Sequence, residues 1–399
     1  MEKPKVRISV RNLVEFILRS GDLDNSRGSS GDKEAMLKGG RLHRKIQRSM
    51  KGNYQAEVSL KRESEYEDTI IQVEGRADGI FTEDGEVWID EIKGTYGNLQ
   101  AMEMPVPVHR AQAMCYGWIY GEKEGLSQIG IQMTYSHLDT EDTRRFREIF
   151  SMEELKKWYQ ELLDAYHKWI AYSLSWKKER NASMTDLQFP FPYREGQREI
   201  VSGVYHTVSS KKTLFVQAPT GVGKTMSAIF PSVRAIGEGK GETLFYLTAK
   251  TITGTVAWEA FHTLRENGLK FKVTAITAKE KLCFLDSPEC TPEKCPYAKG
   301  HFDRVNDAVY ELWTTEEVYS REVIRAHAEK WQVCPFEMCL DLSVWVDGVI
   351  CDYNYAFDPN VHLKRFFGEN ISGDYIFLID EAHNLVERGR EMYLSLIHI

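Results

Sequence analysis

Several features that whole classes of protein need are scarce or absent in this sequence of 399 residues. No apolar run approaches the roughly 18–20 residues of a membrane helix, and the N-terminus lacks the apolar core and cleavage site of a signal peptide. Basic residues are not in excess, and the net charge of −8 gives no indication of nucleic-acid binding. Such binding needs only a local basic groove, so it is not excluded. We therefore expect a globular protein without membrane contact, cytoplasmic by default.

Cysteine is scarce, and its distribution is uneven. The sequence has seven cysteines, and an odd number in a cytoplasmic chain argues against a framework of disulfides. Five of the seven fall between residues 283 and 339. This clustering is the first indication of a metal site.

The residue patterns divide the chain into two halves, with a boundary expected near residue 185. In the first half, Ser9 is expected to cap a helix, and Ser151 with Glu154 forms a capping box that begins a long amphipathic helix. An Asp-Gly turn joins the last two of three strand-like runs. The second half alternates apolar strands with helices, as a parallel α/β sheet does. Helices are expected at 9–19, 34–50, 108–121 and 151–176, and the strand-like runs are 54–63, 68–78 and 86–94.

The hairpin of the first half carries a candidate cutting site. Residues two apart on a strand share a face, so Glu91 and Lys93 point one way and Asp90 the other. Asp78 is expected to end the preceding strand, where the hairpin brings it beside Glu91. Two adjacent carboxylates repel each other unless a cation lies between them, and Mg²⁺ (or Mn²⁺) suits such a pair. A neighbouring lysine would hold an attacking water or stabilise charge on phosphorus.

This arrangement resembles the PD-(D/E)XK nucleases, and more narrowly the RecB-type branch. Asp78 matches the acidic motif, and Glu91 to Lys93 match the E-x-K motif. The stretch "GGRLHRKIQ" resembles a G-x-x-x-H element, which implies His43 as a metal ligand. "QAMCY" resembles a Q-x-x-x-Y helix, which implies DNA or active-site contacts for Gln112 and Tyr116. Two alternatives stay open: a surface hairpin with salt bridges, and an inactive nuclease fold that only binds DNA.

The second half contains a phosphate-binding loop, "QAPTGVGKT". The run "TLFVQA", residues 213–218, is expected to be the strand that leads into it. Its glycines let backbone N–H groups turn onto phosphates, the lysine reaches the β- and γ-phosphates, and the following threonine ligates Mg²⁺. The residues expected to bind ATP here are Thr220, Gly221, Val222, Gly223, Lys224 and Thr225.

A second motif, "YIFLIDEAHN", is the expected partner of that loop. Tyr375–Ile379 is a continuous apolar run that predicts a buried parallel strand. Asp380 and Glu381 follow at its carboxyl end, where ligands bind in open α/β sheets. We expect Asp380 to hold Mg²⁺ through water, Glu381 to orient and deprotonate the attacking water, and His383 to relay the nucleotide state.

The clustered cysteines follow the pattern Cys283-x6-Cys290-x4-Cys295, with a long gap to Cys334. Zinc sites usually show two close pairs, which are missing here. Three cysteines and a distant fourth suit a 4Fe-4S cluster, which needs four thiolates. Zinc and free thiols remain as alternatives, and Cys339 is a possible replacement for Cys334.

Together these motifs resemble the XPD/DinG family of superfamily 2 DNA helicases, in which an iron–sulfur domain lies between the first motor motifs and the DEAH box. The resemblance implies Gln197 as a reader of the adenine base, and Thr248 and Lys250 as contacts to the DNA backbone. Within 297–332, basic and aromatic side chains are candidates for contacts to single-stranded DNA. These candidates are Lys299, Arg304 and Trp331.

The expected fold is therefore α/β throughout: a restriction-endonuclease-like domain (1–184), a RecA-like helicase lobe (185–270 and 341–399) and an inserted 4Fe-4S domain (271–340). The resemblance implies an ATP-dependent 5′→3′ DNA helicase fused to a metal-dependent nuclease, acting on single-stranded or forked DNA in repair. We also expect the chain to lack the second motor lobe, whose arginine assists hydrolysis, and so to hydrolyse ATP slowly.

Overall fold

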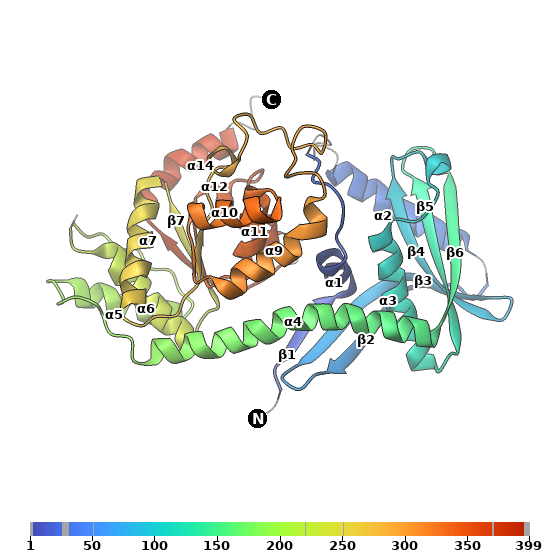
Figure 1. The fold of residues 1–399 in the computed structure, drawn as a ribbon, viewed down its shortest axis with the longest axis horizontal. Helices are drawn as coiled ribbons and strands as arrows, with labels where there is room; N and C mark the ends of the chain where they lie inside the picture. The colour runs from blue at the N-terminus through green and yellow to red at the C-terminus, as the bar shows by residue number, and fades with distance from the viewer. Residues whose placement is uncertain are drawn as a thin grey trace. The chain divides into compact units, whose positions relative to one another are not determined.

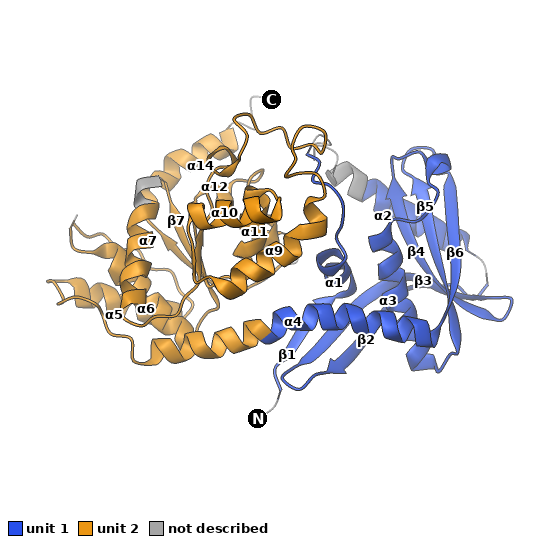
Figure 2. Cartoon of the chain, in the orientation of Figure 1, with its two compact units in different colours: residues 1–171 blue, residues 172–399 orange. Residues whose placement is uncertain are grey.

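The structure is a computed structural model that describes residues 3–25, 32–50, 52–219, 221–249, 251–368 and 371–394, with only the backbone at 32–36 and 251–253. The chain forms two compact units, Met1–Ala171 and Tyr172–Ile399 (Figure 2). The division falls inside helix α4 (Met152–Thr185), earlier than the expected boundary between residues 184 and 185. No helix in the described parts of the chain is long and apolar enough to cross a membrane.

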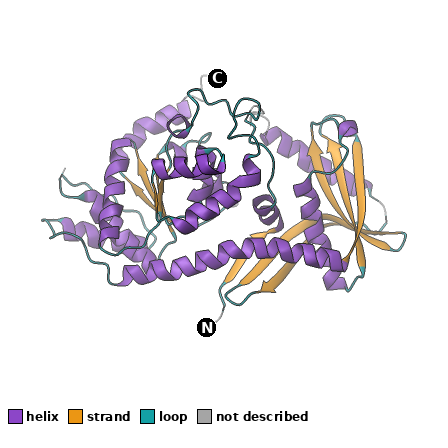
Figure 3. Ribbon diagram, viewed as in Figure 1, coloured by secondary structure: helices purple, strands orange, loops and turns teal. Residues whose placement is uncertain are grey.

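The first unit is built on a mixed sheet with helices beside it (Figures 1 and 3). Strands follow the order β1-β3-β4-β5-β6, and β2 also pairs with β3. The β1–β3 and β4–β5 pairs are parallel, and the other pairs are antiparallel. The elements are β1 (Lys5–Ser9), α1 (Val10–Ile17), α2 (Asp32–Ser49), β2 (Gln55–Glu65), β3 (Ile70–Glu83), β4 (Glu86–Thr95), η2 (Leu99–Ala101), α3 (Pro107–Glu124), β5 (Gln128–His137) and β6 (Thr143–Ser151).

Short-range signals in the sequence account for the ends of these elements. Ser9 caps α1 by accepting a hydrogen bond from the Asn12 N–H at 3.0 Å, as predicted. The Ser151–Glu154 capping box also forms. Between β3 and β4, the turn residues Asp84 (φ 52°) and Gly85 (φ 84°) both adopt positive φ, as the favoured two-residue hairpin turn requires. The predicted hairpin is therefore confirmed.

The second unit contains a parallel sheet with strand order β11-β7-β10-β8-β9. Its strands are β7 (Thr243–Thr248), β8 (Val273–Ala275), β9 (Val318–Tyr319), β10 (Gly348–Asp352) and β11 (Tyr375–Ile379). Its helices are α5 (Gln197–Ser209), α6 (Lys224–Gly237), α7 (Thr251–Glu266), α8 (Lys279–Leu282), α9 (His301–Thr315), α10 (Arg321–Trp331), α11 (Pro335–Ser343), α12 (Asn354–Phe357), α13 (Lys364–Phe367), η3 (Ala382–Asn384) and α14 (Leu385–Leu394). The predicted parallel α/β architecture is confirmed.

Two expectations about strands in this unit are wrong. Residues 213–218, expected as the strand before the phosphate loop, form no strand, and Phe215 is 87% exposed. β11 was expected to be buried, but among the described strands it pairs only with β7, so it lies at the sheet edge and Phe377 is 43% exposed.

The expected insertion, residues 271–340, contributes two short strands to the sheet, one before the cysteine-rich segment and one after α9. β8 and β9 both lie within that range, and β8 pairs with β10. The cysteine-rich segment begins after α8, and helices α9, α10 and α11 follow it. Because β8 and β10 are neighbours, the chain leaves the sheet and returns to a position beside its point of departure.

A buried ionic network joins the last turns of α4 to the sheet of the second unit. Asp347 accepts hydrogen bonds from Arg180 Nη1 at 2.7 Å, from Trp176 Nε1 at 2.8 Å and from the Lys272 N–H at 2.8 Å. The side chains of Arg180 and Asp347 are each only 5% exposed. The hydrogen bonds to Asp347 compensate its buried charge. Removing one partner of the ion pair would leave the other charge buried without compensation.

Candidate functional site

The predicted acidic pair of the first unit comes together on neighbouring strands. β3 continues to Glu83, so Asp78 lies within the strand and not at its end as expected. The register pairs Gly79 with Asp90, which brings Asp78 to the level of Glu91. The Ile92 N–H donates to Asp78 Oδ2 at 2.7 Å, so the carboxylate of Asp78 is held against β4.

A lysine and a histidine complete this acidic cluster. Lys93 Nζ lies 2.8 Å from Glu91 Oε1, and His43 Nδ1, on α2, lies 3.6 Å from Asp78 Oδ1. The four side chains that the sequence singled out therefore meet at one place, although they come from three elements. Lys93 therefore lies beside Glu91, and His43 lies beside Asp78.

Glu91 is the most perturbed group of the cluster. Its side chain is 6% exposed. Burial, and then the neighbouring charge of Asp78, raise its pKa to about 7. Its Oε2 atom is buried and has no hydrogen-bond partner among the described residues. A buried, unpartnered carboxylate oxygen is costly unless something else binds it.

Helix α3 carries the other two predicted residues, and of these Tyr116 lies near the acidic cluster. Gln112 is buried, at 3% exposed. A Cβ on Gly75 would lie 2.7 Å from the Tyr116 hydroxyl, so the tyrosine crosses directly over β3. Burial, followed by the charges of Glu91 and Asp78, raises the pKa of Tyr116, so the hydroxyl keeps its proton and remains a donor beside the carboxylates.

Asp90 points to the opposite side of the strand, as the alternation predicted. It accepts hydrogen bonds from Gln132 at 2.9 Å and Thr134 at 2.6 Å, and from Tyr54 at 3.1 Å. Burial raises the pKa of Asp90 even though these bonds act against the rise. This carboxyl group is committed to the core of the unit and takes no part in the acidic cluster.

The phosphate loop of the second unit has the geometry that its glycines predict. Gly221 (φ 86°) and Gly223 (φ 82°) adopt left-handed conformations, and Gly223 caps α6, which begins at Lys224. Thr220 lies outside the described residues. Val222 O accepts a hydrogen bond from Gln197 Nε2 at 3.0 Å, which fixes the loop to the start of α5.

The loop meets the acidic motif that follows β11. Lys224 Nζ lies 3.7 Å from Glu381 Oε1 and donates to Ala218 O at 3.2 Å. Burial, and then the charge of Glu381, raise the pKa of Asp380. Tyr246, on β7, contacts the Thr225 hydroxyl at 3.5 Å. The lysine, the threonine and both acidic residues therefore gather at the carboxyl end of the sheet, as expected for a Mg-nucleotide site.

Two further predicted residues surround this site. Gln197 is 4% exposed, and its amide is engaged by the loop and by the Arg194 N–H at 3.0 Å. The side chain of His383 is 74% exposed, and its Nδ1 lies 3.4 Å from Glu381 Oε2. To bind the adenine base, Gln197 would have to give up its hydrogen bonds to Val222 O and the Arg194 N–H. The side chain of His383, in contrast, is exposed to solvent.

Tyr353 is a link that the sequence did not reveal. It is fully buried, and its hydroxyl donates to the main-chain oxygen of Asp380. Asp352 and Asn354 on either side of it belong to the end of β10 and the start of α12. The acidic motif is therefore tied to the strand end that lies on the far side of β7.

The cysteines are free thiols, of which some are buried and others are half-buried. Burial works to lower the pKa of Lys279, but a hydrogen bond to Cys290 and the charges of Cys290 and Cys334 raise it overall. These two cysteines, distant in sequence, thus share one lysine. Cys339 instead faces the sheet, with its Sγ 3.7 Å from Thr274 Oγ1 and 3.9 Å from Ala275 O.

Within the ranges that the structure describes, no three His, Cys, Asp or Glu side chains stand together as a group that could hold a metal ion.

Arg304, a candidate DNA contact, donates to Trp331 O at 3.0 Å and Lys299 O at 2.7 Å. The three residues therefore brace one another in the helical segment.

Part of the second unit is similar to known proteins. Residues 263–398 match the DEAD_2 family. This chain is similar to superfamily 2 helicases of the XPD/DinG type. It is 40% identical over 214 residues to a probable ATP-dependent helicase of Methanocaldococcus jannaschii, covering 53% of this chain and 31% of that protein. It is 21% identical over 256 residues to the human regulator of telomere elongation helicase 1, covering 51% and 21% respectively.

The matched segments thus span less than a third of the length of these curated relatives. A solved structure titled "XPD_Helicase" aligns with a TM-score of 0.33 and 19% identity, covering 49% of this chain and 34% of that one. A similarity of that size carries no argument about the fold. The similarity to helicases rests on the DEAD_2 match and the sequence relatives.

Proposed function

We propose that the second unit is the nucleotide-binding lobe of an ATP-dependent DNA helicase, and that the complete protein moves 5′→3′ on single-stranded or forked DNA in repair. One observation carries the proposal: Lys224 of the phosphate loop lies 3.7 Å from Glu381 of the DEAH motif. The DEAD_2 match and the helicase relatives support it.

The residues around this pair have distinct tasks. Lys224 would bind the β- and γ-phosphates, and Glu381 would orient the attacking water and accept its proton. Thr225 and Asp380 would hold Mg²⁺, which neutralises charge on the phosphates when bound. The donor set fits such a cation, because burial and Glu381 together make the negative charge of Asp380 unfavourable without one.

The direct test is the binding of a fluorescent ATP analogue with Mg²⁺. Lys224→Ala should weaken binding at least tenfold, because the phosphates lose their only predicted side-chain cation. Lys211→Ala is the matched control, since Lys211 pairs with Asp374 on the surface and should bind like the wild type. Equal affinities for the wild type and Lys224→Ala would show that the site is misassigned.

For the first unit we propose a metal-dependent DNA nuclease. His43, Asp78 and Glu91 would hold Mg²⁺ or Mn²⁺, which neutralises the scissile phosphate and activates water when bound. The partnerless Oε2 of Glu91 supports this donor set. Lys93 would leave Glu91 Oε1 and donate to the phosphate, and Gln112 and Tyr116 would contact the DNA. Lys93 lies beside Glu91, and His43 lies beside Asp78.

A cleavage assay on single-stranded and forked DNA tests this second proposal. Asp78→Asn should abolish Mg²⁺-dependent cutting but keep the fold, because the amide oxygen still accepts from the Ile92 N–H. Asp84→Asn in the hairpin turn is the control, since asparagine tolerates positive φ. Normal cutting by Asp78→Asn would refute the assignment.

The alternative is an inactive nuclease fold that only binds DNA. The missing group of three metal donors among the described residues favours this reading. The two readings differ in Lys93→Ala. An active nuclease should lose cutting and retain DNA binding, whereas a binding domain has no cutting to lose.

We further propose that Cys283, Cys290, Cys295 and Cys334 hold a 4Fe-4S cluster, which would brace the segment between β8 and β10. Lys279, which is hydrogen-bonded to Cys290 and whose pKa is also raised by the charge of Cys334, supports two of the four ligands. The burial of Cys339 against the sheet favours Cys334 as the fourth. All seven cysteines are free, so none of these thiols is held in a disulfide.

A further inference from the structure

β7 carries a buried tyrosine close to the nucleotide site. Tyr246 is 2% exposed and belongs to the apolar core that also contains Met226, Ile350 and Ile376. A phenylalanine would fill the same place in this core. The hydroxyl therefore needs a separate explanation, because the hydroxyl of a buried tyrosine usually has a polar partner.

The Tyr246 hydroxyl has two polar partners, and they come from the two motifs of the nucleotide site. It lies 3.5 Å from the Oγ1 atom of Thr225, which follows the phosphate loop. It is also hydrogen-bonded to the carboxylate of Asp380. The register of β7 and β11 pairs Tyr246 with Leu378, two residues before that aspartate. One hydroxyl thus joins the two residues that would hold Mg²⁺.

The main chain of Asp380 is fixed by other contacts. Its N–H donates to Leu247 O at 3.0 Å, and its carbonyl oxygen accepts from the Tyr353 hydroxyl. Tyr353 is anchored in turn, because its N–H donates to Thr248 O at 3.1 Å. With the main chain held on both sides, Asp380 keeps mainly the rotation of its side chain, and Tyr246 contacts that side chain.

A hydroxyl group suits this position because it can accept and donate a hydrogen bond at the same time. Thr225 has a single hydroxyl proton. If a lone pair of its oxygen faces a cation, that proton needs an acceptor elsewhere, and the Tyr246 oxygen can accept it. The tyrosine can then donate its own proton to the Asp380 carboxylate, whereas phenylalanine can do neither.

We propose that Tyr246 is a positioning residue of the nucleotide site, which accepts a hydrogen bond from Thr225, donates one to Asp380 and so orients both oxygen ligands toward Mg²⁺. The proposal rests on the proposed nucleotide-binding function of the second unit. It adds a residue of the sheet to a site that the sequence motifs assign to two loops.

The experiment measures binding of a fluorescent ATP analogue to the full chain while the concentration of free Mg²⁺ is varied. Tyr246→Phe should raise the Mg²⁺ concentration for half-maximal binding roughly 10- to 100-fold, the usual effect of losing a group that orients metal ligands. The affinity for the analogue in EDTA should stay unchanged, because Lys224 and the phosphate loop are intact in this variant.

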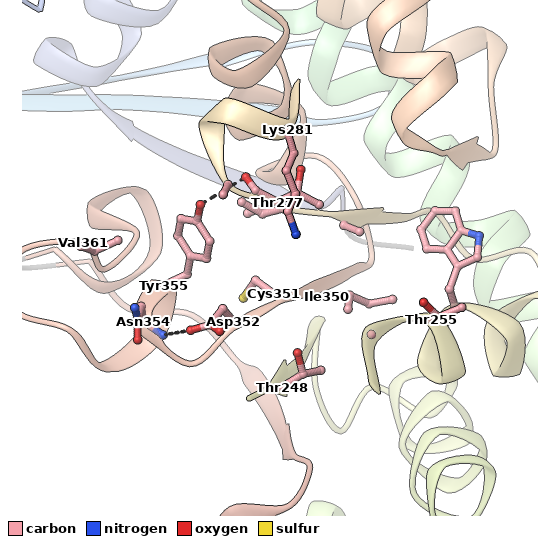
Figure 4. A pocket seen from close by; sticks show the side chains of 15 residues that line it. Thr248, Thr255, Thr277, Lys281, Ile350, Cys351, Asp352, Asn354, Tyr355 and Val361 are labelled. Carbon is pink, nitrogen blue, oxygen red and sulfur yellow. Dashed lines mark hydrogen bonds between the residues drawn. The ribbon is translucent and has the colours of Figure 1, made fainter. Parts of the chain in front are cut away.

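Tyr355→Phe is the matched control, because it also removes one tyrosine hydroxyl from the second unit. That hydroxyl donates to Thr277 O at 3.3 Å (Figure 4). Both residues line a pocket of about 510 Å³, together with Thr248 and Asn354. The control should require the same Mg²⁺ concentration as the wild type.

A double-mutant cycle separates positioning from a purely structural effect. Thr225→Ala should itself raise the half-saturating Mg²⁺ concentration. Adding Tyr246→Phe should then raise it by a smaller factor than in the wild type, because the tyrosine has already lost one of its partners. Two independent effects would instead multiply.

The outcomes distinguish this proposal from the proposed function. If the wild type binds the analogue with Mg²⁺ and Tyr246→Phe needs no more Mg²⁺, the role of Tyr246 is refuted and the nucleotide function stands. If Tyr246→Phe weakens binding equally in EDTA and in Mg²⁺, the tyrosine supports only the fold, and the proposal is wrong. If the wild type shows no Mg²⁺-dependent binding, the proposed nucleotide function fails and this proposal fails with it.

Discussion

The burial of Glu91 should make the stability of the first unit depend on pH, and replacing Glu91 by glutamine should abolish that dependence. The pKa of Glu91 rises from 4.5 to about 7 on folding, and at about 1.4 kcal/mol per pH unit this corresponds to about 3 kcal/mol. Glu91 is only 5% exposed, so solvent screening does not reduce the figure. In the metal-free protein, ionisation of Glu91 should lower the free energy of unfolding by this amount.

The sign follows from proton binding. Between pH 4.5 and 7 the folded state holds a proton that the unfolded state has released, so the free energy of unfolding falls as the pH rises. Below pH 4.5 the cost is absent, and above pH 7 it is complete. Because glutamine does not titrate, the stability gained by Glu91→Gln should grow from near zero at pH 4.5 to about 3 kcal/mol at pH 8.

Amide hydrogen exchange of the full chain in a chelator measures this locally. Peptides from β3 and β4 should become about 100-fold better protected in Glu91→Gln than in the wild type at pH 8, and about equally protected at pH 4.5. Adding Mg²⁺ should shrink the difference, because a bound cation stabilises the ionised carboxylate. A difference that is the same at every pH would refute the reasoning.

Two other perturbations test the second unit. Asp347→Asn should lower the free energy of unfolding by about 3–5 kcal/mol, because it leaves the Arg180 guanidinium buried without its carboxylate. Glu179→Ala is the control, since it breaks only an exposed pair. If Asp347→Asn lowers the urea midpoint no more than this control does, the reasoning is contradicted. Anaerobically purified protein should be brown with about four irons per chain, and Cys290→Ser should bleach it whereas Cys115→Ala, in the other unit, should not. Stoichiometric zinc without iron would exclude the cluster.

Local chemistry made part of this structure predictable. The Ser9 cap, the capping box and the Asp-Gly turn each depend on residues within a few positions of one another. The alternation along β4 placed Glu91 and Lys93 on one face and Asp90 on the other. The acidic cluster followed, because one hairpin turn is enough to set two strands in register.

Pairing between distant segments was not predictable in the same way. The apolar run 213–218 has the composition of a strand, but a strand also needs a partner, and in this structure the run has none among the described strands. The end of the first unit lies inside α4, where the helical periodicity continues without a break. Thr277 and Asn354 line one pocket only because β8 and β10 are neighbours.

The central position of β10 has a consequence for the order in which the second unit folds. β7 and β8 precede β10 in the chain, yet β10 lies between them, so the sheet stays open until the segment that contains the clustered cysteines has been made. Closing such a long loop is slow compared with forming local contacts. A nascent chain whose cysteine segment fails to compact would keep two apolar strand edges exposed. Compaction of that segment should therefore govern how much of the second unit reaches its folded state during synthesis.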